Sequence, residues 1–250
     1  MQGFEGDKYE GWAEYVAYGG MPLALSMRSD EQKARYLERL FAEAYLKDVV
    51  ARNRIAKTQE LEDLVDVLAS SMGALTNPPK IEATFKSVLR SKISTNTISS
   101  YIGYLEESFL IEEARRYDVK GRKYIGSPKK YYFEDMGLRN ARLNFRQIEE
   151  TNIMESIVYN ELRSRGFSVD VGSVEKAERS GGRVVRKQLE VDFVANMGSN
   201  RYYIQSALRL PDASKDRQEK ASLNEVPDSF RKIVLVRDVV KPAYDERGIL

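Results

Sequence analysis

The spacing of apolar residues constrains the fold most, because it changes from a helical period to a strand-like one partway along the chain. Two apolar stripes recur at intervals of three and four in the first third, within 37–45 and within 61–72. Stripes of this kind predict amphipathic helices that pack on a core, and Asp30 is placed to cap the first of them. The motif Tyr18-Gly19-Gly20-Met21-Pro22 precedes them and predicts a sharp turn.

A winged helix-turn-helix is predicted in the middle of the chain. Asn77-Pro78-Pro79 ends the preceding helix, and a short helix is expected over 81–89. The next helix is expected to turn Ile98, Ile102, Leu105 and Phe109 inward. Its opposite face is polar and contains Thr95, Asn96, Ser99 and Ser100. Strand-like segments at 110–111 and 131–133 flank Lys120-Gly121-Arg122 and predict the hairpin of a wing.

The predicted wing is the most basic part of the sequence. Between residues 115 and 130 there are seven basic residues against a single acidic one, Asp118: Arg115, Arg116, Lys120, Arg122, Lys123, Lys129 and Lys130. Such side chains neutralise phosphates, and the hydroxyl and amide groups of the preceding helix can contact phosphates or base edges. The helix face has no arginine, the commonest base reader, which argues against sequence-specific recognition. The alternative is an ordinary solvated helix face and turn.

The last hundred residues predict a separate α/β unit. A helix is expected from about 152 to 165, ending at Gly166, and Gly181-Gly182 predicts a hairpin or a flexible loop. A second helix is expected over 214–224, and the strand candidates are 167–171, 187–195, 201–206 and 232–236. The order helix, three strands, helix, strand predicts a compact unit in which the strands form a small mixed sheet. The predicted class is α+β, with a helical segment (1–75), a winged helix-turn-helix (76–148) and an α/β domain (149–250).

Composition excludes several kinds of chemistry. The 250 residues include no cysteine and no histidine, which rules out thiolate and histidine nucleophiles, catalytic triads and zinc fingers. No phosphate-binding glycine loop is present. With 42% hydrophobic and 31% charged residues, no apolar run long enough for a membrane and a polar start, the sequence predicts a cytoplasmic protein without a membrane partner. The net charge of +2 is too small to indicate a partner by itself.

A degenerate metal site is predicted in the α/β unit. Glu190 and Asp192 lie on one apolar strand, Gln205 lies on the next, and Glu155 lies on the preceding helix. Carboxylates that converge in this way could hold Mg²⁺ for phosphodiester hydrolysis, with Asp192 and Glu190 as the metal ligands. A cation is expected two residues after Gln205, and this position is Ala207. The sequence therefore favours a structural remnant over an active site.

The chain also resembles the C-terminal region of a family of prokaryotic AAA+-type ATPases. The matching segments, in order, are Tyr18 to Pro22, Tyr45 to Val50, Thr97 to Glu106, Lys130 to Arg139, Glu155 to Gly166, and Glu190 to Phe193 together with Ile204-Gln205. The resemblance implies a winged helix followed by a domain similar to PD-(D/E)XK nucleases. It makes Glu155 the helix acid and Asp192 the metal-binding aspartate, with Gln205 in place of the second acid. It also implies that a P-loop ATPase domain, where ATP would bind, lies upstream of Met1.

The leading interpretation is a non-catalytic accessory region of an ATPase that binds DNA or a protein partner through the winged helix and the basic hairpin. The alternatives are an atypical Mg²⁺-dependent nuclease and a protein-interacting module that docks or regulates the ATPase domain. The last residues, Gly248-Ile249-Leu250, resemble the start of a strand. We expect this end to be frayed or incompletely paired.

Overall fold

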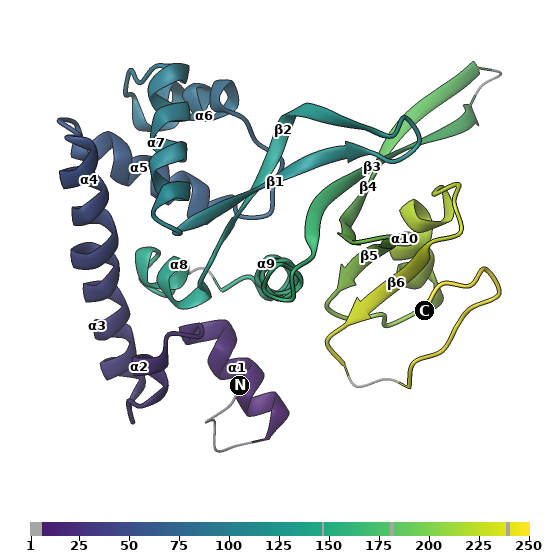
Figure 1. Ribbon diagram of the computed structural model, residues 1–250, viewed down its shortest axis with the longest axis horizontal. Coiled ribbons are helices and arrows are strands. Elements are labelled where there is room, and N and C mark those ends of the chain that lie inside the picture. Colours follow the sequence, from purple (N-terminus) through teal and green to yellow (C-terminus); the bar gives the residue numbers. More distant parts are fainter. Residues whose placement is uncertain (1–6, 147, 181–182, 239–240) are drawn as a thin grey trace. The chain divides into compact units, whose positions relative to one another are not determined.

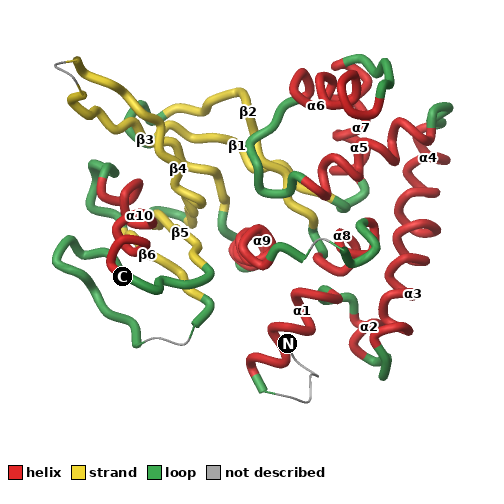
Figure 2. The backbone as a smooth tube through the Cα atoms, turned by 180° about the vertical axis from the view of Figure 1, so that it is seen from behind, coloured by secondary structure: helices red, strands yellow, loops and turns green. Residues whose placement is uncertain are grey.

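A computed structural model describes residues 7–146, 148–180, 183–238 and 241–250 of the chain. Helices and a six-stranded mixed sheet make up the protein, which confirms the predicted α+β class (Figures 1 and 2). Its contacts divide the chain into a first unit, 1–113 with 131–156, and a second unit, 114–130 with 157–250. The division of the sequence at 75 and 148 stays a prediction. No helix in the described ranges is long and apolar enough to cross a membrane.

The first unit is mainly helical. Its helices are α1 (Lys8–Tyr18), α2 (Pro22–Leu25), α3 (Asp30–Leu40), the π-helix η1 (Phe41–Leu46), α4 (Lys47–Asn53), α5 (Thr58–Ser70), α6 (Pro78–Thr84), the π-helix η2 (Phe85–Leu89), α7 (Thr95–Glu107) and α8 (Met136–Arg142). The predicted break falls between α1 and α2. The predicted cap is wrong by one residue, because Ser29 accepts a hydrogen bond from the Gln32 backbone while Asp30 begins the helix. Asp30 still stabilises the helix, because a carboxylate in the first turn interacts favourably with the positive end of the helix dipole.

Helix α8 holds the first unit together. Asp135 caps it by accepting a hydrogen bond from the Leu138 backbone (3.0 Å), and its other oxygen accepts one from the Gly20 backbone (2.7 Å). The buried Arg139 donates to the Ala69 carbonyl at the end of α5 (3.0 Å). Asn140 donates to the Val16 carbonyl of α1 (2.8 Å). These side chains satisfy carbonyls that helix ends leave without partners.

The helices of the predicted helix-turn-helix are present, with one wrong assignment. Asn77 caps α6, and Ile98, Ile102 and Leu105 of α7 are buried as predicted. Phe109 is instead 76% exposed. Helix α7 ends before it, and Phe109 has a positive φ of 56°, so its side chain leaves the apolar stripe.

The second unit is built on the sheet. Its strands are β1 (Ile111–Asp118), β2 (Lys123–Phe133), β3 (Ser168–Ser180), β4 (Arg183–Met197), β5 (Asn200–Ala207) and β6 (Arg231–Val236), in the order β2-β1-β3-β4-β5-β6. The inner ends of β1 and β2 belong to the first unit. Strand β3 pairs with β1 in parallel and β5 pairs with β6 in parallel, whereas β4 is antiparallel to β3 and β5. The predicted mixed sheet is confirmed.

Two helices cover the two faces of this sheet. Helix α9 (Glu150–Ser164), which begins in the first unit, places the Tyr159 ring against Phe193, and α10 (Ala213–Asn224) packs Leu223 against Val194 and Tyr203. Phe193 and Val194 are adjacent on β4, so their side chains lie on opposite faces. The order of helix, three strands, helix and strand is as the sequence predicts.

Strands β3 and β4 are longer than predicted. They remain paired from Ser168 opposite Asn196 to Ser180 opposite Arg183, whereas the sequence predicts strands only over 167–171 and 187–195. Gly181-Gly182, where a hairpin or flexible loop is predicted, lies outside the described residues. The additional segments are rich in charged residues and lack the regular alternation of apolar and polar residues that identifies strands.

The last residues pair only partly, as predicted. Ile249 forms an isolated parallel bridge with Lys232, and the Leu250 backbone donates to the Lys232 carbonyl (3.0 Å). Ile249 is nevertheless buried among the residues that pack on α10. This end is therefore held by backbone hydrogen bonds to β6 and by the buried Ile249 side chain instead of being frayed.

Candidate functional site

At the turn between β1 and β2, two basic side chains have no acidic partner among the residues that the structure describes. Figure 1 shows this turn at the end of the β1–β2 pair. It comprises residues 119–122, and Arg122 has a positive φ of 51°. Arg122 and Lys123 are exposed, and within the described ranges neither side chain makes a hydrogen bond or an ion pair. Asp118, the acidic residue of this segment, accepts a hydrogen bond from the Gly121 backbone (2.9 Å) and so shapes the turn. We call residues 115–130 the hairpin tip.

Two further exposed cations of the hairpin tip are held in place. The Arg115 guanidinium lies over the Tyr124 ring, 4.3 Å from its centre, and its Nε is 3.9 Å from Asp170 Oδ1. Burial raises the pKa of Asp170, against the opposing effect of the Tyr124 hydroxyl and the Arg115 charge. Lys120 Nζ donates to the Glu175 carbonyl (2.5 Å) and lies 3.5 Å from Glu225 Oε2. Both cations remain accessible and are oriented by these contacts.

The remaining predicted phosphate ligands are less accessible. Lys130 is 3% exposed, and its Nζ lies 2.6 Å from Glu190 Oε1. A buried lysine that is already ion-paired does not lie on a phosphate-binding surface, so its assignment to that surface is corrected here. Arg116 is half-buried and donates to Ser173 Oγ (3.2 Å), and Lys129 is half-buried on β2.

The polar face of α7 is partly engaged by the protein itself. Asn96, Ser99 and Ser100 are exposed, as predicted for a recognition face. The Ser99 hydroxyl donates to the Thr95 carbonyl (3.0 Å), and the Ser100 hydroxyl donates to the Asn96 carbonyl (3.1 Å). Thr95 is half-buried and its hydroxyl donates to Glu82 of α6. Asn96 is thus the best placed of the four for an outside partner.

The sequence-based list of basic residues overlooks a cluster in the turn between α6 and α7. Lys86, Arg90 and Lys92 line a groove of about 570 Å³ that reaches Ser94 at the start of α7. Lys86 pairs with Glu82 (2.5 Å), whereas Arg90 and Lys92 have no ion pair among the described residues. In the sequence, the basic residues on either side of Ser91 are the signal that could have indicated this cluster.

Asp192 lies at an irregularity in the sheet. Between the pairs Asp170–Val194 and Gly172–Val191, β4 has one residue more than β3, which is a β-bulge at Asp192 and Phe193. Pairing of β4 with β5 ends at Phe193 opposite Ile204. The buried Asp192 carboxylate continues the connection, because Oδ2 accepts a hydrogen bond from the Ser206 backbone (2.7 Å). This carboxylate therefore fastens β5 to β4 where the ladder stops.

Gln205 lies beside Asp192, as predicted, and its amide is committed to protein contacts. Its Nε2 donates to Asp192 Oδ1 (2.8 Å). Its Oε1 accepts from the Ser222 hydroxyl of α10 (3.2 Å). An acid at this position would repel Asp192, whereas the amide bonds to it without a metal between them.

The other predicted acids are also engaged. Glu190, two residues before Asp192, pairs with the buried Lys130, and Glu155 accepts a hydrogen bond from the Tyr132 hydroxyl (2.5 Å). Glu155 belongs to the first unit, and the other three residues belong to the second. In the described ranges, no three acidic side chains gather closely enough to hold a metal ion. Glu190 and Asp192, the two predicted metal ligands, each have hydrogen-bond or ion-pair partners within the protein.

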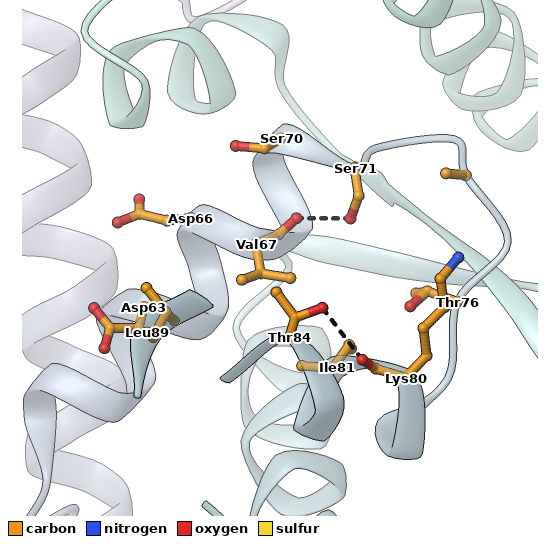
Figure 3. A pocket seen from close by; sticks show the side chains of 11 residues that line it. Asp63, Asp66, Val67, Ser70, Ser71, Thr76, Lys80, Ile81, Thr84 and Leu89 are labelled. Carbon is orange, nitrogen blue, oxygen red and sulfur yellow. Dashed lines mark hydrogen bonds between the residues drawn. The ribbon is translucent and has the colours of Figure 1, made fainter. Parts of the chain in front are cut away.

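A separate pocket contains none of the predicted site residues. It has a volume of about 360 Å³ and is lined by α5, α6, the loop between them and η2, with Val67, Ile81 and Leu89 among the lining residues (Figure 3). The Ser71 hydroxyl donates to the Val67 carbonyl (2.6 Å), and the Thr84 hydroxyl donates to the Lys80 carbonyl (3.2 Å). These polar groups already have partners within their own helices.

Comparison with known proteins shows the family of this chain. Residues 9–149, more than half of the chain, match the family described as "Domain of unknown function (DUF8612)". An uncharacterized protein of Haemophilus influenzae (strain ATCC 51907 / DSM 11121 / KW20 / Rd) is 32% identical over 224 residues, which are 90% of this chain and 52% of the relative. The chain therefore spans about half the length of that relative.

One solved structure was also matched, protein VC1899 from Vibrio cholerae. It is 12% identical, the match covers 86% of this chain and 49% of that protein, and the TM-score is 0.23. A score this low carries no argument about fold or function. On the sequence matches, the chain belongs to the DUF8612 domain family.

Proposed function

We propose that this chain binds duplex DNA without cutting it, as an accessory region of an ATPase. The observation that carries the proposal is the unneutralised charge of Arg122 and Lys123 at an exposed turn. Lysine and arginine on such a turn bind phosphates without reading sequence. The motor that would use this region is the P-loop domain implied by the resemblance.

The distribution of charge supports DNA as the partner. Seven basic residues and one acidic residue give the hairpin tip a formal charge of +6, although the whole chain carries only +2. The rest of the chain is therefore net acidic. A polyanion would be attracted to the hairpin tip and repelled by much of the remaining surface.

The bonding of the acids supports a non-catalytic role. Asp192 fastens two strands, Glu190 neutralises a buried lysine, and Gln205 donates to Asp192. A metal-dependent hydrolase needs oxygen ligands free to take the ion. In this protein the Asp192 and Glu190 carboxylates are already engaged by protein groups, which supports a structural role for them.

The test is DNA binding across a salt series. Fluorescence anisotropy with a labelled duplex would compare the wild type with Arg122→Gln/Lys123→Gln. The control, Lys47→Gln/Arg52→Gln, removes the same charge from α4, where both residues pair with acids one turn away. We expect wild-type affinity to fall as salt rises, with a slope about 1.8 units steeper than that of the hairpin variant.

Three results would redirect the proposal. Equal affinity of the hairpin variant and the wild type at low salt would show that the hairpin tip does not contact DNA. Absence of any binding at low salt would favour a docking or regulatory module for other proteins. Cuts that need Mg²⁺ and disappear in Asp192→Ala would establish the nuclease alternative.

A further inference from the structure

The outer part of the β3–β4 pair is a two-stranded ribbon. It comprises residues 175–180 and 183–188, paired from Glu175 opposite Gln188 to Ser180 opposite Arg183. The pairing of β3 with β1 stops at Ser173, and that of β4 with β5 starts at Phe193. Figure 1 shows the ribbon extending beyond the β1–β2 turn. Six residues per strand give it a length of about 20 Å.

The ribbon is strongly basic. Five basic residues oppose Glu175 and Glu178, so it carries a formal charge of +3, more than the whole chain. The side chains of Arg179 and Arg183 are exposed and form no ion pair or hydrogen bond among the described residues. Arg186 is exposed and lies 3.6 Å from Glu175, a contact worth little at the surface.

Apolar side chains lie among these arginines. Val184 is 61% exposed and Val185 is 41% exposed, on opposite faces of the ribbon. A two-stranded pair outside a sheet gains little stability from its own contacts. The ribbon is about 20 Å long and carries exposed arginine and valine side chains. These features are consistent with a surface that a binding partner covers.

We infer that the β3–β4 ribbon enters the major groove of duplex DNA. A B-DNA major groove, about 12 Å wide, admits a two-stranded β-ribbon, and the arginines would reach the phosphates on either side. Because Val184 and Val185 lie on opposite faces, one of the two would lie near base edges, where thymine methyl groups provide apolar contact. The inference rests on the proposed DNA binding and adds a second element and a groove to it.

The hairpin tip and the ribbon lie together in the second unit. Lys120 of the turn donates to the Glu175 carbonyl at the base of the ribbon, which places the free cations of the tip beside it. A ribbon in the groove would thus leave the hairpin tip near the phosphates of the same duplex. With +6 and +3 assigned to these two elements, the remainder of the chain carries −7.

Double-stranded RNA provides the discriminating ligand. Its A-form major groove is too deep and narrow for side chains to read, whereas its phosphates still attract cations. A ribbon that enters the groove therefore makes the protein prefer DNA over an RNA duplex of the same sequence. Surface phosphate contacts alone would give no such dependence on the ribbon.

The experiment compares Arg179→Gln/Arg183→Gln/Arg186→Gln with the hairpin variant and with a charge-matched control, Arg35→Gln/Lys47→Gln/Arg52→Gln. Anisotropy would be measured with DNA and RNA duplexes over a salt series. We expect the ribbon variant to bind DNA at least tenfold more weakly at about 0.15 M salt, with a slope lower by about 2.7. We also expect it to lose the preference for DNA over RNA. Amide NMR spectra would verify that the strands remain paired.

The two proposals fail in different ways. Wild-type protein that binds no duplex at low salt overturns both. A ribbon variant that matches its control in affinity and in DNA preference, while the hairpin variant is weakened, overturns the ribbon inference alone. Competition supplies a second measurement: a major-groove ligand should displace the wild type more readily than a minor-groove ligand, and the reverse order contradicts the ribbon inference.

Discussion

The sequence and the structure indicate two different roles for the Asp192 side chain. Its sequence context predicts a metal ligand, and the structure shows a carboxylate that accepts hydrogen bonds from the Ser206 backbone and the Gln205 amide. The β4–β5 pairing ends at Phe193, within the bulge that β4 forms against β3. Beyond this point the Asp192 carboxylate provides the next hydrogen bond between β4 and β5. Sequence alone predicts the proximity of Asp192 and Gln205, because both lie on neighbouring strands, and it contains no signal for the bulge.

We predict that Asp192→Ala destabilises the protein. Removing the carboxylate leaves the Ser206 N–H and the Gln205 amide without their acceptor, which costs about 1–3 kcal/mol in the free energy of unfolding. Urea denaturation followed by circular dichroism would measure it. A ligand retained only for metal binding would behave oppositely, because removing its buried charge would leave stability unchanged or raise it.

Asp135 gives a prediction that depends on pH. Burial raises its pKa, although the Gly20 and Leu138 backbone groups oppose the shift. A carboxyl group with a raised folded-state pKa binds a proton more readily in the folded than in the unfolded protein. Its contribution to stability therefore grows as pH falls through that pKa toward the ordinary value of 3.8.

We predict that Asp135→Asn lowers the free energy of unfolding at every pH, because one of the two amide donors loses its acceptor. The loss should increase as the pH is lowered from neutrality, since the wild type gains from protonating Asp135 and the variant does not. Denaturation curves at several pH values would measure the difference. A difference that shrinks in acid would contradict the raised pKa.

At the scale of elements, the meeting of α1 and α8 depends on glycines. A Cβ on Gly137 would overlap the Tyr18 carbonyl, and a Cβ on Gly19 would overlap the Asp135 carboxylate. These contacts explain the motif that the sequence identifies only as a turn. They involve residues more than a hundred positions apart, and a local pattern contains no information about such a distance.

We predict that Gly137→Ala destabilises the protein by about 1–3 kcal/mol, because backbone must shift to admit the methyl group. Gly103→Ala provides the matched control, since nothing lies near its Cβ position in α7. That change should stabilise by about 0.5–1 kcal/mol through helix propensity. Thermal unfolding of both variants would distinguish them, and equal effects would contradict the predicted close approach.

The helices were easier to predict than the ribbon. The stripes of α5 and α7 bury one face, so their periods appear in the sequence. The outer parts of β3 and β4 bury neither face, and alternation of apolar and polar residues has no cause there. Phe109 was misplaced for a related reason, because its spacing fits the stripe although the helix ends before it.

For the whole molecule, the separation of charge has a kinetic consequence. Two neighbouring elements of the second unit carry +9 formally, while the rest is net acidic. Such asymmetry steers an approaching polyanion, which raises the association rate at low ionic strength. The division into units could not be read from composition, because the second unit takes residues 114–130 from the middle of the first.

We predict that removing the charges of Arg122, Lys123, Arg179, Arg183 and Arg186 slows association with duplex DNA. The rate constant at low salt should fall by an order of magnitude or more, and the variant should converge with the wild type as salt rises. Stopped-flow fluorescence would measure both. A rate unchanged by the five substitutions would mean that the field of these elements does not guide DNA.

The hydrogen bonds from Asn140 to α1 also bear on how the chain is made. The carbonyls of Val16 and Ala17 receive their donor from a residue more than 120 positions later. At a synthesis rate of about 5–20 residues per second, the first helix leaves the ribosome many seconds before α8 exists. Until then α1 has partners such as Lys33 of α3, which pairs with Glu14, but the face that α8 covers remains exposed and accessible to chaperones.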